Sequence, residues 1–144
     1  MSSLPEPLVH VHLVAIGGTG MGALAGLLHA RGLRVTGSDR ALYPPMSDAL
    51  ARWRIPVALG FDANNVLSPR PDLVVIGNAV RADNPEAQAV FEAGIPHRSF
   101  PDALYELAMA DKQRLVVTGT HGKTTTTALC AYLLHATGRD PSFL

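Results

Sequence analysis

The chain has 144 residues, of which 47% are hydrophobic and 17% are charged, and its formal net charge is zero. This composition supports a hydrophobic core of about one domain and excludes a chain that is disordered by composition. Because 12 basic residues balance 12 acidic ones, the clustered basic charge that marks nucleic-acid-binding proteins is missing, and we expect no nucleic-acid partner.

The single cysteine, Cys130, excludes an intrachain disulfide and fits a reducing compartment. The first residues lack a signal-peptide pattern, since Pro5, Glu6 and Pro7 precede the first apolar run. No apolar stretch reaches the ~18 residues that suggest a membrane span. We therefore expect a cytoplasmic protein without a membrane partner.

Apolar runs alternate with helix-like segments along most of the chain. We expect strands at residues 9–16, 33–36, 56–59, 73–77, 95–98 and 115–118. We expect helices at residues 21–31, 47–53, 85–93 and 124–137, and a further helix that opens at residues 99–102. Asn84, Pro85 and Glu86 suit a helix start as cap, first residue and acid at the positive end. This order predicts a Rossmann-like, doubly wound α/β fold with a parallel sheet.

A glycine-rich loop, IGGTGMG at residues 16–22, follows the first expected strand and opens a helix. Glycines let the backbone turn tightly and approach a phosphate, and the helix offers free N–H groups. Asp39 ends the second expected strand, where an acid accepts hydrogen bonds from ribose hydroxyls in dinucleotide-binding folds. Two simpler interpretations stay open, a tight turn without a ligand and an Asp39 that only serves a surface turn.

A second loop, VTGTHGKTT at residues 117–125, has the Gly-x-x-Gly-Lys-Thr pattern of a phosphate-binding loop. Its backbone N–H groups can cradle phosphates, Lys123 can reach the phosphate oxygens, and the Thr124 hydroxyl can ligate Mg²⁺. Val117 stands where the longer Walker pattern has its first glycine. His121 lies in the loop and either approaches the phosphates or faces solvent.

One strand, one loop and one helix cannot bury both faces of a parallel strand. We therefore expect two domains. Residues 1–111 form a complete nucleotide-binding domain, and residues 112–144 form the incomplete start of a phosphate-loop ATPase domain.

Several stretches resemble the Mur ligases that act on UDP-N-acetylmuramate, and together they span nearly the whole chain. These are HLVAIGGTGMG (12–22), VTGSD (35–39), DLVVIGNAV (72–80), NPE (84–86), GIP (94–96) and VTGTHGKTTT (117–126). Within the family, YPPMS (43–47) and GNA (77–79) look most like the murein-recycling branch, which uses the tripeptide L-alanyl-γ-D-glutamyl-meso-diaminopimelate. The branch that adds L-alanine is the alternative.

The resemblance implies two sets of site residues. The UDP-sugar set is Gly17, Gly18, Thr19, Gly20, Met21, Ser38, Asp39, Asn78 and Ala79. The ATP set is Gly119, Thr120, His121, Gly122, Lys123, Thr124 and Thr125. Lys123 and Thr124 would be catalytic, and Thr124 would ligate Mg²⁺. Asn78 has an open alternative, in which its side chain only bonds a nearby loop.

The resemblance also implies an ATP- and Mg²⁺-dependent ligase. The muramoyl carboxylate would be phosphorylated by ATP to an acyl phosphate. The amine of a peptide or amino acid would then attack it, and phosphate would leave. The family's other Mg²⁺ ligands and its amino-substrate domain would lie beyond residue 144, so we expect this chain alone to be inactive.

The last helix exposes Leu129, Leu133 and Leu134 unless something covers them. We expect it to pack on the first domain, to associate with a second copy, or to be poorly ordered. Two hypotheses from other classes stay open. An NAD-binding oxidoreductase domain would leave the second loop unexplained, and a non-catalytic nucleotide-binding module would use only the first.

Overall fold

The computed structural model describes residues 4–143. The chain divides into two compact units, Met1–Ala110 and Asp111–Leu144. This division falls one residue before the boundary expected from the sequence. What each unit binds stays a prediction.

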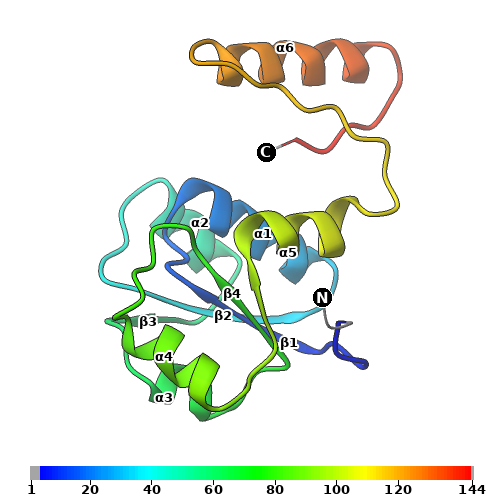
Figure 1. The fold of residues 1–144 in the computed structure, drawn as a ribbon. Helices are drawn as coiled ribbons and strands as arrows, with labels where there is room; N and C mark the ends of the chain where they lie inside the picture. Colours follow the sequence, from blue (N-terminus) through cyan, green and yellow to red (C-terminus); the bar gives the residue numbers. More distant parts are fainter. Residues whose placement is uncertain (1–3, 144) are drawn as a thin grey trace. The chain divides into compact units, whose positions relative to one another are not determined.

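The first unit contains a five-stranded parallel sheet, as predicted (Figure 1). Its strands are β1 (His10–Val14), β2 (Arg34–Asp39), β3 (Val57–Leu59), β4 (Leu73–Ile76) and β5 (His97–Ser99). Their order across the sheet is β3-β2-β1-β4-β5. The chain leaves β1 first toward β2 and later returns to its other side with β4. The carboxyl ends of β1 and β4 therefore flank a topological switch point, where open α/β sheets bind ligands.

Helices cover both faces of this sheet. They are α1 (Thr19–Ala30), α2 (Met46–Arg52), α3 (Asn64–Leu67), α4 (Pro85–Glu92) and α5 (Phe100–Leu104), and the π-helix η1 (Tyr105–Met109) continues α5. Figure 1 shows α1, α2 and α5 on one face and α3 and α4 on the other. Two buried apolar clusters, one on each face, fill the spaces between the sheet and these helices. Each fully buried leucine or valine there contributes roughly 1.5–3 kcal/mol.

The start of α4 confirms the helix start predicted at residues 84–86. The Asn84 side-chain oxygen accepts hydrogen bonds from the N–H groups of Glu86 (2.9 Å) and Ala87 (3.2 Å), and Pro85 is the first helical residue. The helix ends before Gly94, whose φ of +60° suits glycine. The sequence did not predict α3, which is too short for a helical repeat to appear and begins where the Asp62 carboxylate accepts from the Asn64 N–H.

The described residues of the second unit form one helix, α6 (Lys123–Ala136). The strand predicted at residues 115–118 is wrong, because these residues are irregular and Leu115 and Val116 are 67% and 73% exposed. A β-strand needs a neighbouring strand to pair its backbone groups, and none of the five described strands pairs with this segment. Leu129 and Leu133 on α6 are exposed, as expected, whereas Leu134 is half-buried.

Among the described residues, no helix has both the length and the apolar character to cross a membrane.

Candidate functional site

A cavity of about 350 Å³ lies at the carboxyl ends of β1, β2 and β4. It coincides with the switch point of the sheet, where ligands of this fold class bind. The residues that line it are Ala15, Asp39, Arg40, Phe61, Ala79, Val80, Arg81, Asp83, Asn84 and Pro85. We call this cavity the crevice.

The first glycine loop connects β1 to α1 beside the crevice. Ala15 begins it with a φ of +65°, a left-handed conformation that is uncommon outside glycine. The Gly17 N–H donates to the Asp39 carboxylate at 2.8 Å, and a Cβ at Gly17 would lie 2.8 Å from that same oxygen. Any side chain at position 17 would therefore crowd the Asp39 carboxylate and make it shift. The sequence predicted both residues as site residues, and the structure brings them together.

The other loop glycines differ in what surrounds them. A Cβ at Gly18 would have only the Ala15 carbonyl oxygen near it, at 4.0 Å, so this position faces open space. A Cβ at Gly20 would lie 3.0 Å from the Phe100 ring, and one at Gly22 would overlap Met46. Gly20 and Gly22 therefore allow α1 to pack closely against its neighbours, a role that motif spacing alone does not reveal.

The remaining residues of the UDP-sugar set fall into two groups. Thr19, Asn78 and Ala79 are exposed, and Ala79 lines the crevice. Asn78 makes no side-chain hydrogen bond to any described residue, so nothing in the structure ties it to a nearby loop. Ser38 and Met21 are buried and do not line the crevice. The Ser38 hydroxyl instead donates to Glu86 at 2.5 Å.

Charged side chains and an aromatic ring line the crevice. The Arg40 guanidinium lies 6.0 Å from the centre of the Phe61 ring, within reach of a cation–π interaction. The Arg81 Nε lies 3.6 Å from an Asp83 carboxylate oxygen, and both side chains are largely exposed. An exposed pair of this kind contributes little to stability, so Arg81 can turn toward an anionic ligand at small cost. Sequence reasoning did not single out Arg40, Phe61 or Arg81, because no motif marks them.

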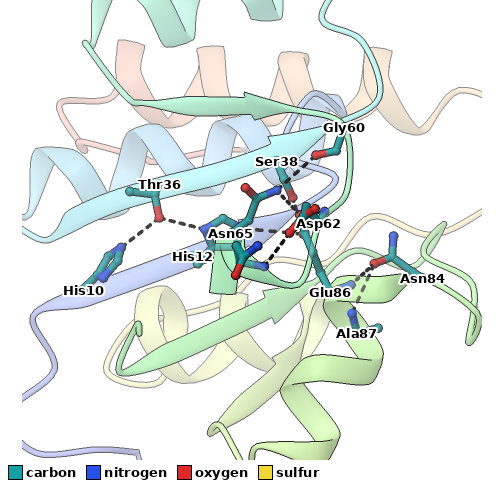
Figure 2. A network of polar contacts seen from close by, with 11 residues as sticks. His10, His12, Thr36, Ser38, Gly60, Asp62, Asn65, Asn84, Glu86 and Ala87 are labelled. Atoms are coloured by element: carbon teal, nitrogen blue, oxygen red, sulfur yellow. Dashed lines mark hydrogen bonds and ion pairs between the residues drawn. The ribbon is translucent and has the colours of Figure 1, made fainter. Parts of the chain in front are cut away.

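A polar network extends from β1 and β2 to the start of α4, and its residue Asn84 also lines the crevice (Figure 2). The Thr36 hydroxyl forms hydrogen bonds with His10 Nε2 (2.9 Å) and His12 Nδ1 (2.8 Å). Burial, helped by nearby Arg34, lowers the pKa of His10 below its ordinary value. His12 Nε2 is buried 3.8 Å from a Glu86 carboxylate oxygen, too far for a hydrogen bond. The two histidines thus have structural roles in the sheet.

The second glycine loop lies in the second unit and is built differently. Its residues from Gly119 to Thr125 are all exposed. Gly119 and Gly122 have φ values of +150° and +77°, in the left-handed region that favours glycine. The Lys123 ammonium donates to the Gly119 carbonyl at 2.7 Å, which holds the charge over the loop. Thr124 follows in the first turn of α6, where a hydroxyl can face a bound ion.

A larger hollow of about 1050 Å³ runs beside the edge strand β5 and is lined in part by Pro5, Phe91 and Asp102. It touches neither glycine loop, so we do not take it as the nucleotide site. Among the described residues, no group of three or more His, Cys, Asp or Glu side chains could hold a metal ion.

The model of the Mur ligase family, catalytic domain, matches residues 10–112. The chain belongs to the Mur ligase family.

Two ligases of the family resemble the chain over nearly its full length. The UDP-N-acetylmuramate–L-alanyl-γ-D-glutamyl-meso-2,6-diaminoheptandioate ligase of Escherichia coli (strain K12) is 44% identical over 136 residues, covering 94% of this chain and 30% of that protein. The UDP-N-acetylmuramate–L-alanine ligase of Arthrobacter sp. (strain FB24) is 46% identical over 140 residues, covering 96% of this chain and 29% of that protein. The chain thus spans less than a third of these Mur ligases.

A solved structure agrees with the fold. The UDP-N-acetylmuramate:L-alanyl-γ-D-glutamyl-meso-diaminopimelate ligase from Neisseria meningitides superposes with a TM-score of 0.86 at 39% identity. The superposition covers 91% of this chain and 40% of that one. This similarity confirms the α/β fold class predicted from the sequence.

Proposed function

We propose that the chain is the UDP-N-acetylmuramate-binding part of an ATP-dependent ligase that joins this sugar nucleotide to the tripeptide L-alanyl-γ-D-glutamyl-meso-diaminopimelate. The observation that carries the proposal is a glycine loop bound to Asp39 beside a cavity at the switch point, in a chain 44% identical to a ligase named for these substrates. Residues 1–111 would hold the sugar nucleotide, and residues 112–144 would contribute to ATP binding.

The crevice and the glycine loop beside it offer groups suited to the pyrophosphate, the base and the ribose of the ligand. The exposed loop at Gly18 and Thr19 leads into the N-terminus of α1, whose free N–H groups suit a pyrophosphate. Arg40 and Arg81 can add positive charge, and Phe61 offers an aromatic face to the base. Asp39 already accepts from Gly17, and it can accept from a ribose hydroxyl beside it.

ATP and Mg²⁺ would be held by the second loop. Its residues fit this role, since Gly119 and Gly122 provide a turn without side chains and Lys123 places its ammonium over the loop. The Thr124 hydroxyl would ligate the ion, which supplies charge neutralisation for phosphoryl transfer to the muramoyl carboxylate. Lys123 would stabilise the charge that develops on the transferred group.

The alternative within the family is a ligase for L-alanine, favoured by the 46% identity to an L-alanine ligase. Both candidates use UDP-N-acetylmuramate, so the proposed ligand of this chain is the same in either case. A comparison of tripeptide and L-alanine as co-substrates of the longer protein would separate the two.

Self-association through α6 is also a proposal. Leu129 and Leu133 expose apolar surface that a second copy could cover. Sedimentation of the wild type beside a Leu129→Glu, Leu133→Glu variant tests it, and a monomer at every wild-type concentration would rule it out.

Calorimetric titration with UDP-N-acetylmuramate, UDP and NAD tests the main proposal. UDP-N-acetylmuramate should bind, and at 100-fold excess over its Kd it should stabilise the folded chain by about 2.7 kcal/mol. NAD should not bind. Binding of NAD without binding of UDP-N-acetylmuramate would replace the ligase proposal with an oxidoreductase domain.

A further inference from the structure

Glu86 is a carboxylate with no exposed surface, placed in the first turn of α4. Burial of an ionised carboxylate is costly unless hydrogen bonds compensate for the lost water. Four groups surround it. One oxygen accepts from the Ser38 hydroxyl and lies near His12, and the other accepts from Asn65 at 2.6 Å and from the Asp62 N–H at 3.2 Å. Figure 2 shows these groups converging on the one side chain.

The charge state of Glu86 follows from these contacts. Burial is the largest single influence and raises the pKa of the carboxyl group. The polar groups around it together outweigh burial, so the pKa lies below its ordinary value and the group is ionised at neutral pH. A buried anion with partners from several elements ties those elements together, because each partner would otherwise lose a charged hydrogen bond.

Each of two partners of Glu86 stands next to a residue that lines the crevice. Ser38 precedes Asp39 at the end of β2, and Asp62 follows Phe61 in the turn between β3 and α3. Glu86 itself follows Pro85, which lines the crevice at the start of α4. The carboxylate thus lies behind three segments of the crevice lining, which come from distant parts of the sequence.

We propose that Glu86 is a positioning residue of the crevice, whose carboxylate fixes the turn carrying Phe61 against the end of β2 that carries Asp39 and Arg40. It would not touch the ligand. It would set the distance between the aromatic ring and the glycine loop, and therefore the affinity for the sugar nucleotide. This inference rests on the proposed function for its ligand, but its geometric part stands on the polar contacts alone.

The first test compares Glu86→Gln with Glu92→Gln, the same change at an exposed position of the same helix. The substitution keeps the side-chain volume and removes the charge. UDP-N-acetylmuramate affinity should fall about tenfold in Glu86→Gln, when measured well below the melting temperature of each variant. Glu92→Gln should bind as the wild type does. Equal affinity in folded Glu86→Gln would overturn the proposal.

The second test uses a milder pair, since loss of the buried charge could unfold the chain. Asn65→Ala removes one donor to Glu86, together with the longer bond (3.2 Å) from the same amide to the Gly60 carbonyl. Asn64→Ala changes its exposed neighbour, whose side chain makes no hydrogen bond to a described residue. Affinity should fall several-fold in Asn65→Ala, in keeping with the loss of one charged hydrogen bond, and should not change in Asn64→Ala. Equal affinity in both would count against the proposal.

An NMR measurement separates failure of this inference from failure of the proposed function. The Phe61 ring signals and their cross-peaks to Arg40 should shift in ligand-free Glu86→Gln and Asn65→Ala, and not in the two controls. If the wild type does not bind UDP-N-acetylmuramate, the proposed function fails and these signals still decide the role of Glu86. Unchanged Phe61 signals in both test variants would refute it.

Discussion

The two glycine loops share the same order in the sequence, an apolar run followed by a glycine loop and a helix, yet they differ in how the surrounding structure supports them. Two features fix the loop after β1. The strand β1 that precedes it is buried between two other strands, and within the loop the Gly17 N–H donates to the Asp39 carboxylate. The loop before α6 follows a segment that forms no strand, and its residues are exposed. A loop motif therefore specifies its own backbone turns, whereas the strand that should precede it depends on a sheet.

The largest contrast should appear in the free energy of unfolding. Leu13→Ala in β1 removes a fully buried side chain and should cost about 2–5 kcal/mol, through lost burial and a cavity. Leu129→Ala on the exposed face of α6 should change stability by less than about 0.5 kcal/mol. Urea unfolding, followed by circular dichroism, measures both. Similar costs would mean that the second unit has a core of its own.

The next largest effect concerns the first loop itself. Gly17→Ala would press a methyl group against the Asp39 carboxylate, at 2.8 Å, and against Leu42, at 3.0 Å. We expect it to destabilise the chain by about 1–3 kcal/mol and to weaken binding of UDP-N-acetylmuramate. Gly18→Ala is the matched control for stability, because its φ of −67° is ordinary and its side chain would face open space. A neutral Gly17→Ala would show that Asp39 is free to move.

Asp72 gives a smaller, pH-dependent effect at the start of β1. Its carboxylate accepts from the N–H groups of His10 (2.8 Å) and Val9 (2.9 Å), and these bonds lower its pKa below the ordinary value. A lowered carboxyl pKa stabilises the fold above the unfolded-state pKa, and the gain is lost as the pH falls through the folded-state pKa. Asp72→Asn should therefore cost about 1 kcal/mol at pH 7.

The gap in stability between Asp72→Asn and the wild type should narrow as the pH falls below about 4. Thermal unfolding across this pH range measures it, with Asp140→Asn in the second unit as the control. A gap that stays constant with pH would show that the hydrogen bonds, and not the charge, stabilise the start of β1.

The smallest effect on stability should come from Lys123→Ala, because this side chain is exposed and its one described hydrogen bond is to its own loop. We expect a change of less than about 0.5 kcal/mol, while any response of the chain to ATP and Mg²⁺ should disappear. Fluorescence titration with a labelled ATP analogue measures the response, and Lys112→Ala is the control. A response that survives Lys123→Ala would place ATP elsewhere.

Local sequence signals were reliable where the interactions that form an element lie within one short stretch of residues. The cap at Asn84 and a helix end near residue 93 were predicted from local rules, and both are found in the structure. The parallel sheet followed from alternating runs, since each crossover through a helix brings the next strand in parallel. The strand at residues 115–118 was predicted by the same apolar signal and was wrong, because pairing is not a local property.

By itself, the sequence determined the α/β class, the family, and both glycine loops, because these depend on the order of residues along short stretches. Only the tertiary structure decided which residues share the crevice. Phe61 and Arg40 come from different strand ends, and Glu86 binds a partner 48 residues away in sequence. Glu86 had looked like an ordinary acid at a helix start. Its burial was decided by the sheet packed beneath α4, which no spacing rule along the chain describes.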